Sequence, residues 1–271
     1  MTAADASAQD LTALETTIRS GTTEQKRDAL FQIRNLRSEI ASRAAVPALK
    51  DPDPIVRVTA ASAIVFLPKS EAITALIPNL ADKDAFVRKE TAYALGRVES
   101  PDAAAPLAAM LSREKDLEVK AAVVVALGQT GNPSAIDPLI TILMRSPKKD
   151  EEFIRRAAAR SIGQIAQITR TGEEQVVTPQ SFLPEKLKDL TGEDLTARFP
   201  AFGAAVVALI SVLRSTSESD DTRREAAFAL GAIGNRNAIA ALETNRNCPD
   251  PYLAEIAREA LAKIEKSNPA N

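Results

Sequence analysis

The sequence contains no histidine, no tryptophan and a single cysteine, Cys248. Histidine is the commonest general base, proton shuttle and metal ligand at neutral pH, so its absence removes the groups on which much acid–base and metal catalysis depends. One cysteine excludes a disulfide within the chain and any cluster of cysteine ligands around a metal. We therefore expect no metal and no other cofactor, and we predict that the protein is not an enzyme.

Glycine, with 10 residues, and aromatic residues, at 4%, are also scarce, so Ala, Leu, Ile and Val supply most of the 45% of apolar residues. Ala and Leu are strong helix formers, and this composition favours an all-α fold. No stretch approaches the roughly 18 apolar residues that a membrane-spanning helix needs. The first ten residues lack the basic and apolar regions of a signal peptide, which favours a cytoplasmic location. An exported protein whose leader has been removed could begin in the same way.

One sequence pattern recurs along the chain, with a basic residue eight positions before a glycine. It reads FVRKETAYALGRV from Phe86, EVKAAVVVALGQT from Glu118, FIRRAAARSIGQI from Phe153 and DTRREAAFALGAI from Asp221. The same frame fits the residues around Arg57 and, more loosely, those around Lys26 and Ala254. The anchor positions are 26, 57, 88, 120, 155, 223 and 254, and subtraction gives separations of 31, 31, 32, 35, 68 and 31. A period of this length is typical of helical repeat proteins.

Each repeat is predicted to be a pair of helices. The second helix follows an aspartate that can cap its first turn, as at Asp53, Asp84, Asp116 and Asp250. Proline follows directly at two of these sites, where its missing N–H costs nothing. Proline also recurs inside the first helix of several repeats, where it is expected to bend the helix.

Paired helices of this length with the pattern D-x-x-V-R-x-x-A-x-x-A-L-G resemble HEAT repeats, most closely the short HEAT-like type named after phycobilisome lyases. The resemblance implies a right-handed α-solenoid of about seven HEAT-like hairpins with one insertion. It implies a binding scaffold but identifies a fold better than a function. The expected divisions are a flexible N-terminus (1–9), repeats 1–5 (10–168), an insertion or eroded repeat (169–200), repeats 6 and 7 (201–266) and a flexible C-terminus (267–271).

A row of basic residues marks the repeats, at Arg57, Arg88, Lys120, Arg155 and Arg223. In three repeats the basic residue lies four positions after the capping aspartate, a spacing that favours an ion pair on one helix face. The resemblance to HEAT repeats implies instead that this ladder bridges neighbouring repeats. Both interpretations are structural, and we prefer them to a phosphate-binding row. The glycines of the pattern do not follow strands, so we expect them to allow close packing between helices.

The exposed side of the second helices is the candidate binding surface. If Val87, Thr91, Ala94 and Val98 point inward, then Lys89, Tyr93 and Arg97 point outward onto the inner, concave surface of the solenoid. Arg and aromatic residues anchor many interfaces, so this strip suits an acidic protein segment. The alternative is that the cations are merely solvated while the aromatics pack inward. The predicted partner-binding residues are Arg27, Phe31, Phe66, Lys89, Tyr93, Arg97, Arg156, Arg160, Arg224 and Phe228.

The function that these observations favour is a non-catalytic, monomeric scaffold for a protein partner. Two alternatives stay open. The first is an accessory protein that holds a bilin during its attachment, as the family name suggests, and it would be marked by visible absorbance. The second is a HEAT-like nucleic-acid binder, which the net charge of −2 and the pI near 5.5 make a poor match.

Overall fold

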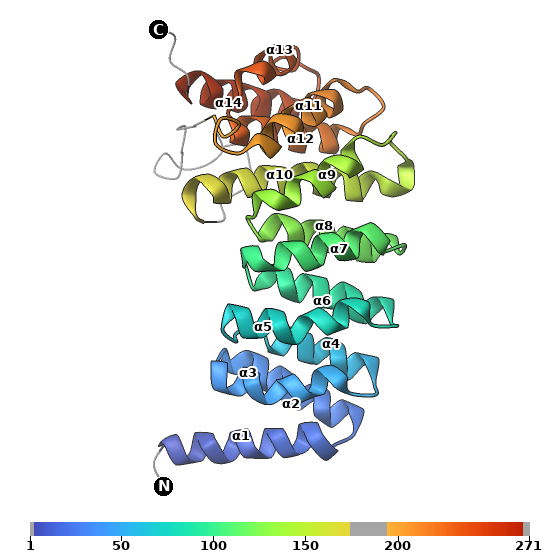
Figure 1. The fold of residues 1–271 in the computed structure, drawn as a ribbon, viewed down its shortest axis with the longest axis vertical. Coiled ribbons are helices and arrows are strands. Elements are labelled where there is room, and N and C mark those ends of the chain that lie inside the picture. The colour runs from blue at the N-terminus through green and yellow to red at the C-terminus, as the bar shows by residue number, and fades with distance from the viewer. Residues whose placement is uncertain (1–2, 174–193, 268–271) are drawn as a thin grey trace. The chain divides into compact units, whose positions relative to one another are not determined.

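The computed structural model describes residues 3–173 and 194–267, and within these ranges all the regular structure is helical. Fourteen α-helices follow one another in seven successive pairs (Figure 1), which confirms the predicted all-α fold of about seven hairpins. The first helices of the pairs are α1 (Ala3–Ser20), α3 (Glu39–Ala45), α5 (Lys69–Leu76), α7 (Ala104–Arg113), α9 (Ile136–Leu143), α11 (Pro200–Arg214) and α13 (Ile239–Glu243). The second helices are α2 (Thr23–Leu36), α4 (Pro54–Ala63), α6 (Ala85–Arg97), α8 (Leu117–Gln129), α10 (Glu152–Thr171), α12 (Asp220–Ile233) and α14 (Pro251–Ser267).

Short 3₁₀ helices stand beside most of the first helices. Pro47 and Pro78 are the second residues of η1 and η2, where α3 and α5 tighten into 3₁₀ helices rather than bending as α-helices. This tightening follows from the missing N–H of proline, which cannot join the α-helical hydrogen-bond ladder. The segments are η1 (Val46–Lys50), η2 (Ile77–Ala81), η3 (Pro101–Ala103), η4 (Pro133–Ala135), η5 (Lys149–Glu151) and η8 (Arg236–Ala238).

The predicted aspartate caps are confirmed. The Asp53 carboxylate accepts a hydrogen bond from the backbone N–H of Ile55, and Asp84, Asp116 and Asp250 each accept two from the first turn of their helices. Because these N–H groups have no partner within the helix, each aspartate stabilises the start of its second helix by about 1 kcal/mol.

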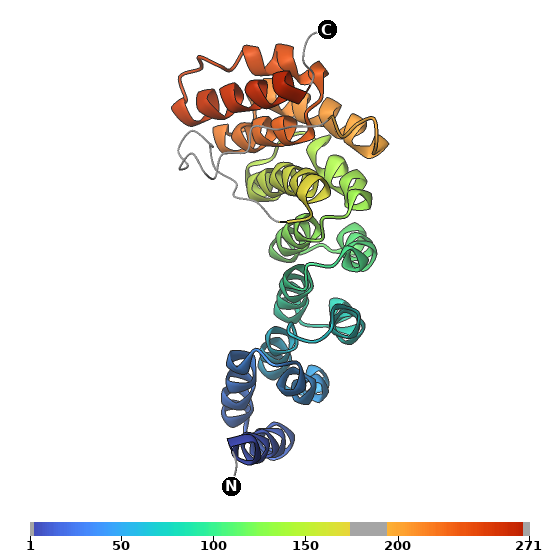
Figure 2. The same ribbon diagram turned by 90° about the vertical axis from the view of Figure 1, so that its left-hand side faces the viewer.

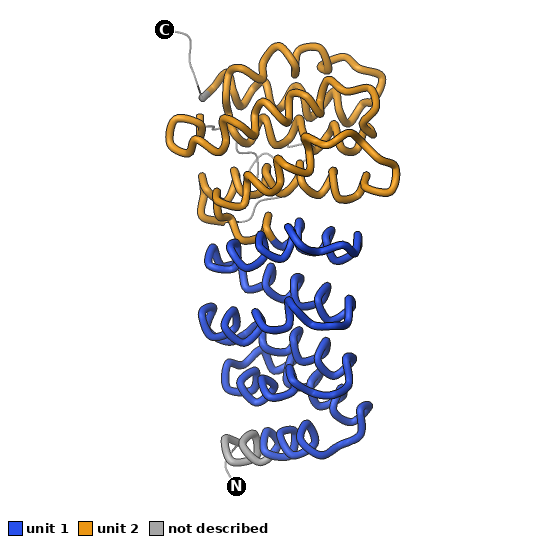
Figure 3. The backbone as a smooth tube through the Cα atoms, turned by 45° about the vertical axis from the view of Figure 1, so that its right-hand side comes forward, with its two compact units in different colours: residues 1–126 blue, residues 127–271 orange. Residues whose placement is uncertain are grey.

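The chain divides into two compact units, Met1–Ala126 and Leu127–Asn271 (Figure 3), and each is described on its own. In unit 1, α4 packs between α2 and α6 in one layer, while the first helices form a second layer beside it (Figure 2). In unit 2, α12 packs between α10 and α14. Within each unit the second helices of successive repeats therefore pack against one another, as in other solenoids.

Small residues allow the second helices to approach one another. Ala61, Ala92, Ala159 and Ala227 are fully buried. Close packing at the glycine row is confirmed where a Cβ would collide with the next repeat. A Cβ on Gly128 would lie 2.6 Å from Ser161 Oγ, and one on Gly231 would lie 2.8 Å from Ala260 Cα.

The basic ladder links consecutive repeats, as the resemblance to HEAT repeats implies. Lys26 Nζ lies 2.7 Å from Asp51, Arg57 Nε 2.8 Å from Asp82 and Arg88 Nε 2.7 Å from Glu114. In unit 2, Arg155 pairs with Glu218, and both side chains are almost completely buried. Each of these acids directly precedes the second helix of the following repeat.

The ion pair expected between ladder cation and capping aspartate does not form at Arg57 or Arg88. The carboxylates of Asp53 and Asp84 accept hydrogen bonds from backbone N–H groups. The two arginines pair instead with an acid of the following repeat. Arg57 Nη1 also donates to the carbonyls of Asp51 and Pro52. Arg57 and Arg88 thus fix the turn before their own second helix and also link it to the following repeat.

The Arg88–Glu114 ion pair is expected to break only at a pH far below that at which an ordinary glutamate is protonated. The Arg88 guanidinium is the main cause that lowers the pKa of Glu114 to about 2. A carboxylate with a lowered folded pKa contributes stability above its unfolded pKa of about 4.3 and loses it as the pH falls through the folded value. We expect wild type to lose about 2 kcal/mol more than Glu114→Gln between pH of about 5 and about 2, measured by urea unfolding. Parallel pH profiles for the two proteins would contradict the assigned link.

The N-terminal part of the predicted insertion extends the preceding helix. α10 continues to Thr171 and ends at Gly172 in the left-handed conformation, with φ of 77°. Residues 174–193 of the predicted insertion, where the sequence suggests a short helix, lie outside the described residues. Where the description resumes, Leu195 is buried and its N–H donates to the carbonyl of Ile233. At the other end of the chain, α1 begins within the stretch 1–9 that was expected to be flexible.

Candidate protein-binding face

The predicted register of the second helices is confirmed in α6. Val87, Thr91, Ala94 and Val98 are all buried. The opposite side of α6, with the equivalent sides of the other second helices, is called the second-helix face below. It carries Lys89, Tyr93 and Arg97 on α6.

In unit 1 the predicted binding residues differ in accessibility. Arg97 and Phe31 are exposed, the latter at 41%, whereas Arg27, Lys89 and Tyr93 are half-buried. Phe66 is half-buried but lies beyond the end of α4, which stops at Ala63. The helical register that placed Phe66 in line with the others is therefore wrong there. Pro68 disfavours the α conformation at Leu67, so α4 could not in any case have continued through Phe66 into the next helix.

In unit 2 the predicted cations are paired with acids of the following repeat. Arg156 Nη1 lies 3.0 Å from Asp221, and Arg160 Nη1 lies 4.0 Å from Glu225. Arg224 contacts both Asp221 and Asp250. The positive charge that the sequence predicts for this part of the strip is thus largely neutralised within the protein itself.

Phe228 packs inward. Its half-buried ring lies against Gly163, where a Cβ would stand 2.7 Å from Cδ1 of the ring. The ring fills the space that the glycine leaves between α10 and α12. Phe228 therefore follows the alternative interpretation, in which the aromatic residues of the strip pack inward.

Three exposed aromatic residues of this face were missed in the sequence. Phe86, Phe153 and Tyr252 are 42%, 49% and 53% exposed, and each lies near the start of a second helix. Lys89 stands over the Phe86 ring and Arg156 over the Phe153 ring, each 5.3 Å from the centroid. The signal was available, because each aromatic stands two residues before an anchor position of the repeat.

One carboxylate of unit 2 has a perturbed environment. Burial raises the pKa of Glu225, although the positive charges of Arg160 and Arg156 oppose the shift. No group of three or more metal-ligating side chains gathers within residues 3–173 and 194–267.

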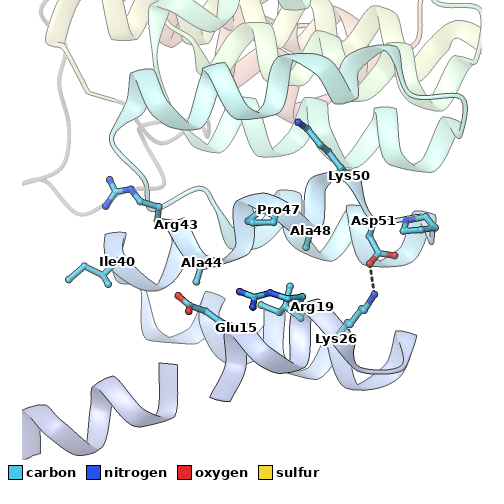
Figure 4. A pocket seen from close by; sticks show the side chains of 12 residues that line it. Glu15, Arg19, Lys26, Ile40, Arg43, Ala44, Pro47, Ala48, Lys50 and Asp51 are labelled. Atoms are coloured by element: carbon cyan, nitrogen blue, oxygen red, sulfur yellow. Dashed lines mark hydrogen bonds and ion pairs between the residues drawn. The ribbon is translucent and has the colours of Figure 1, made fainter. Parts of the chain in front are cut away.

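A cleft of about 750 Å³ opens on the side of unit 1 where α1 faces α3 and η1 (Figure 4). Glu15 and Arg19 enter it from α1, and the ladder pair Lys26–Asp51 closes one end (Figure 4). The cleft is lined by none of the predicted binding residues. Half of its lining residues are charged, so it differs from the mostly apolar pockets that hold small ligands.

Comparison with known proteins agrees with this repeat architecture. HEAT repeats match residues 42–128 and 107–179, and the PBS lyase HEAT-like repeat matches residues 222–245. The chain therefore belongs to the HEAT-repeat family, with repeats near the phycobilisome-lyase type. A crystal structure of an engineered protein superimposes with a TM-score of 0.57 at 20% identity, covering 94% of this chain and 68% of the other. This last likeness supports the fold alone.

Two natural relatives are similar in sequence. Deoxyhypusine hydroxylase-B of Oryza sativa subsp. japonica is 26% identical over 259 residues, which cover 88% of this chain and 86% of that protein. The phycocyanobilin lyase subunit alpha of Nostoc sp. (strain PCC 7120) is 33% identical over 94 residues, covering 29% of this chain and 34% of that protein.

These relatives correct the prediction that the protein is not an enzyme. Both carry names of catalysed reactions, so HEAT repeats of this type are compatible with catalysis. The prediction relied on the missing histidine and on the single cysteine. That reasoning excludes only chemistry that needs those groups, because carboxylates, lysines and tyrosines also transfer protons.

No helix in the described parts of the chain combines the length and the apolar character needed to cross a membrane.

Proposed function

We propose that the chain binds a segment of another protein along its second-helix face, and that the segment is acidic. The observation that carries the proposal is the exposure of cations and aromatics together on this face. In unit 1 alone it presents Phe31, Phe86 and Arg97 to solvent. Aromatic and arginine side chains anchor protein interfaces, and exposed apolar residues rimmed by charge mark such surfaces.

The repeat architecture supports this proposal. Stacked hairpins present one side chain per repeat at each equivalent position, so a bound segment can make periodic contacts along the stack. The hydroxylase and lyase relatives are compatible with it, since an enzyme must also hold its substrate. The lyase relative is by name a subunit, and it works as part of an assembly.

The hydroxylase name raises the question of a metal. Non-haem iron oxygenases commonly hold their metal with two histidines and one carboxylate, and this chain has no histidine. The residues present do not supply that ligand set. The proposal therefore takes no chemical step from the hydroxylase.

Site-specific photo-cross-linking tests which face is used. A photoreactive phenylalanine analogue at Tyr93 is expected to cross-link the partner in a native extract. The same analogue at Ile77, which is 41% exposed on the first-helix side of unit 1, serves as the matched control. Adducts at position 93 and none at position 77 would support the proposal. Adducts only at position 77, or none at either position, would overturn it.

A further inference from the structure

Three arginines of unit 1 lack the acidic partners that the other cations of the second-helix face have. Lys89, Arg156 and Arg224 each pair with an acid one repeat further along. Arg27, Arg34 and Arg97 form no ion pair and no side-chain hydrogen bond with any residue that the structure describes. Arg27 Nε is buried without a hydrogen-bond acceptor. We call these three residues the guanidinium cluster.

Two members of the cluster share one side of α2. Arg27, Phe31 and Arg34 are spaced by four and three residues, which places them in one row along the helix. Phe31 is exposed between the two cations. A bound segment could therefore meet positive charge on both sides of an aromatic ring.

The third member approaches from α6. α4 lies between α2 and α6, and it carries the short side chains of Val58 and Ser62 at the equivalent positions of this face. Long arginine side chains can reach toward each other above them. Partial desolvation lowers the pKa of Arg97, and the positive charge of Arg34 lowers it further. Arg34 and Arg97 therefore carry like charge on the same face of unit 1, on second helices separated only by α4.

We infer that the guanidinium cluster is the site that receives the acidic side chains of the bound segment, with Phe31 receiving an apolar one. This inference rests on the proposed function and deepens it. A guanidinium presents paired N–H donors that match a carboxylate, so Glu or Asp side chains can neutralise Arg34 and Arg97 together. The arginines of unit 2 are less available to a bound carboxylate, because they already form ion pairs with acids of the protein itself.

Fluorescence anisotropy with a labelled peptide of Glu and Leu tests the site. We compare Arg34→Gln/Arg97→Gln with the matched pair Arg156→Gln/Arg224→Gln, which removes the same charge from unit 2. The first pair is expected to weaken binding roughly tenfold or more, and the second less than about threefold. The matching peptide of Lys and Leu and a single-stranded oligothymidylate serve as the other two probes.

The outcomes separate the site from the function. If both variant pairs weaken the Glu peptide equally, the cluster is not the site, while an acidic partner stays supported. If wild type binds the Lys peptide or the oligonucleotide as tightly as the Glu peptide, the acidic partner itself is refuted. A thermal melt without peptide adds an independent check, because Arg34→Gln/Arg97→Gln relieves repulsion. Its Tm should equal or exceed that of wild type, and a clearly lower Tm would show that the arginines serve packing instead.

Discussion

Arg155→Ala is expected to lower the free energy of unfolding by about 3–5 kcal/mol, because it leaves a buried charge without its partner. Arg155 is 2% exposed, and its guanidinium binds the Glu218 carboxylate. It also donates to the carbonyls of Ile142, Leu143 and Arg145 at the end of α9. Truncation would strand all of these acceptors away from water.

Urea unfolding of two further variants makes this expectation specific. Arg155→Met combined with Glu218→Met removes both charges together, and it should recover most of the lost stability. Arg246→Ala removes an exposed arginine that pairs with Glu243, and it should change stability by less than about 0.5 kcal/mol. If Arg155→Ala resembled Arg246→Ala, the Arg155–Glu218 pair would be exposed in solution, contrary to the structure.

Those features of the fold that depend on near neighbours could be predicted from the sequence. Asp84 caps α6 because a capping aspartate acts on the N–H groups two and three residues later. The inward row of Val87, Thr91, Ala94 and Val98 follows from the helical period alone. Because the same cap and the same helical period recur in successive repeats, they were enough to predict the helical hairpins.

The charge state of the second-helix face could not be predicted in the same way. The helical register placed Arg156 on the surface, but its partner Asp221 lies 65 positions away, beyond the segment that interrupts the repeats. Counting cations along the strip therefore overestimated its positive charge in unit 2. Arg34 was missed because a four-residue step from Arg27 to Phe31, repeated once, leads to Asn35 instead.

The positions at which the helices end could not be predicted reliably from the sequence either. Phe66 was predicted to lie on the binding face because four-residue steps from Val58 and Ser62 lead to it, which assumes that α4 is as long as α6. α4 ends at Ala63, while α6 continues to Arg97. Nothing in the repeat pattern marks that difference, and only Pro68 hints at it.

Gly231→Leu is expected to destabilise the protein by about 3 kcal/mol through overpacking. A Cβ at Gly231 would lie 2.7 Å from Ala260 Cβ and 2.8 Å from Ala260 Cα. The obstacle is thus partly backbone, which cannot turn aside as a side chain can. Gly128→Leu should cost less, about 2 kcal/mol, because the three atoms nearest its added Cβ belong to the side chains of Ser161 and Gln164, which can move aside.

Gly203→Leu is the matched control for these two substitutions. Gly203 lies in α11, and no atom stands within 4 Å of its added Cβ. Replacing a helical glycine there should be neutral or stabilise the fold by up to about 1 kcal/mol. Chemical denaturation should therefore rank the variants with Gly231→Leu least stable, then Gly128→Leu, then Gly203→Leu. If Gly231→Leu and Gly203→Leu were equally stable, helix propensity rather than contact between repeats would govern the glycine row. In that case α12 and α14 would have to be more loosely packed in solution than the buried alanines between them indicate.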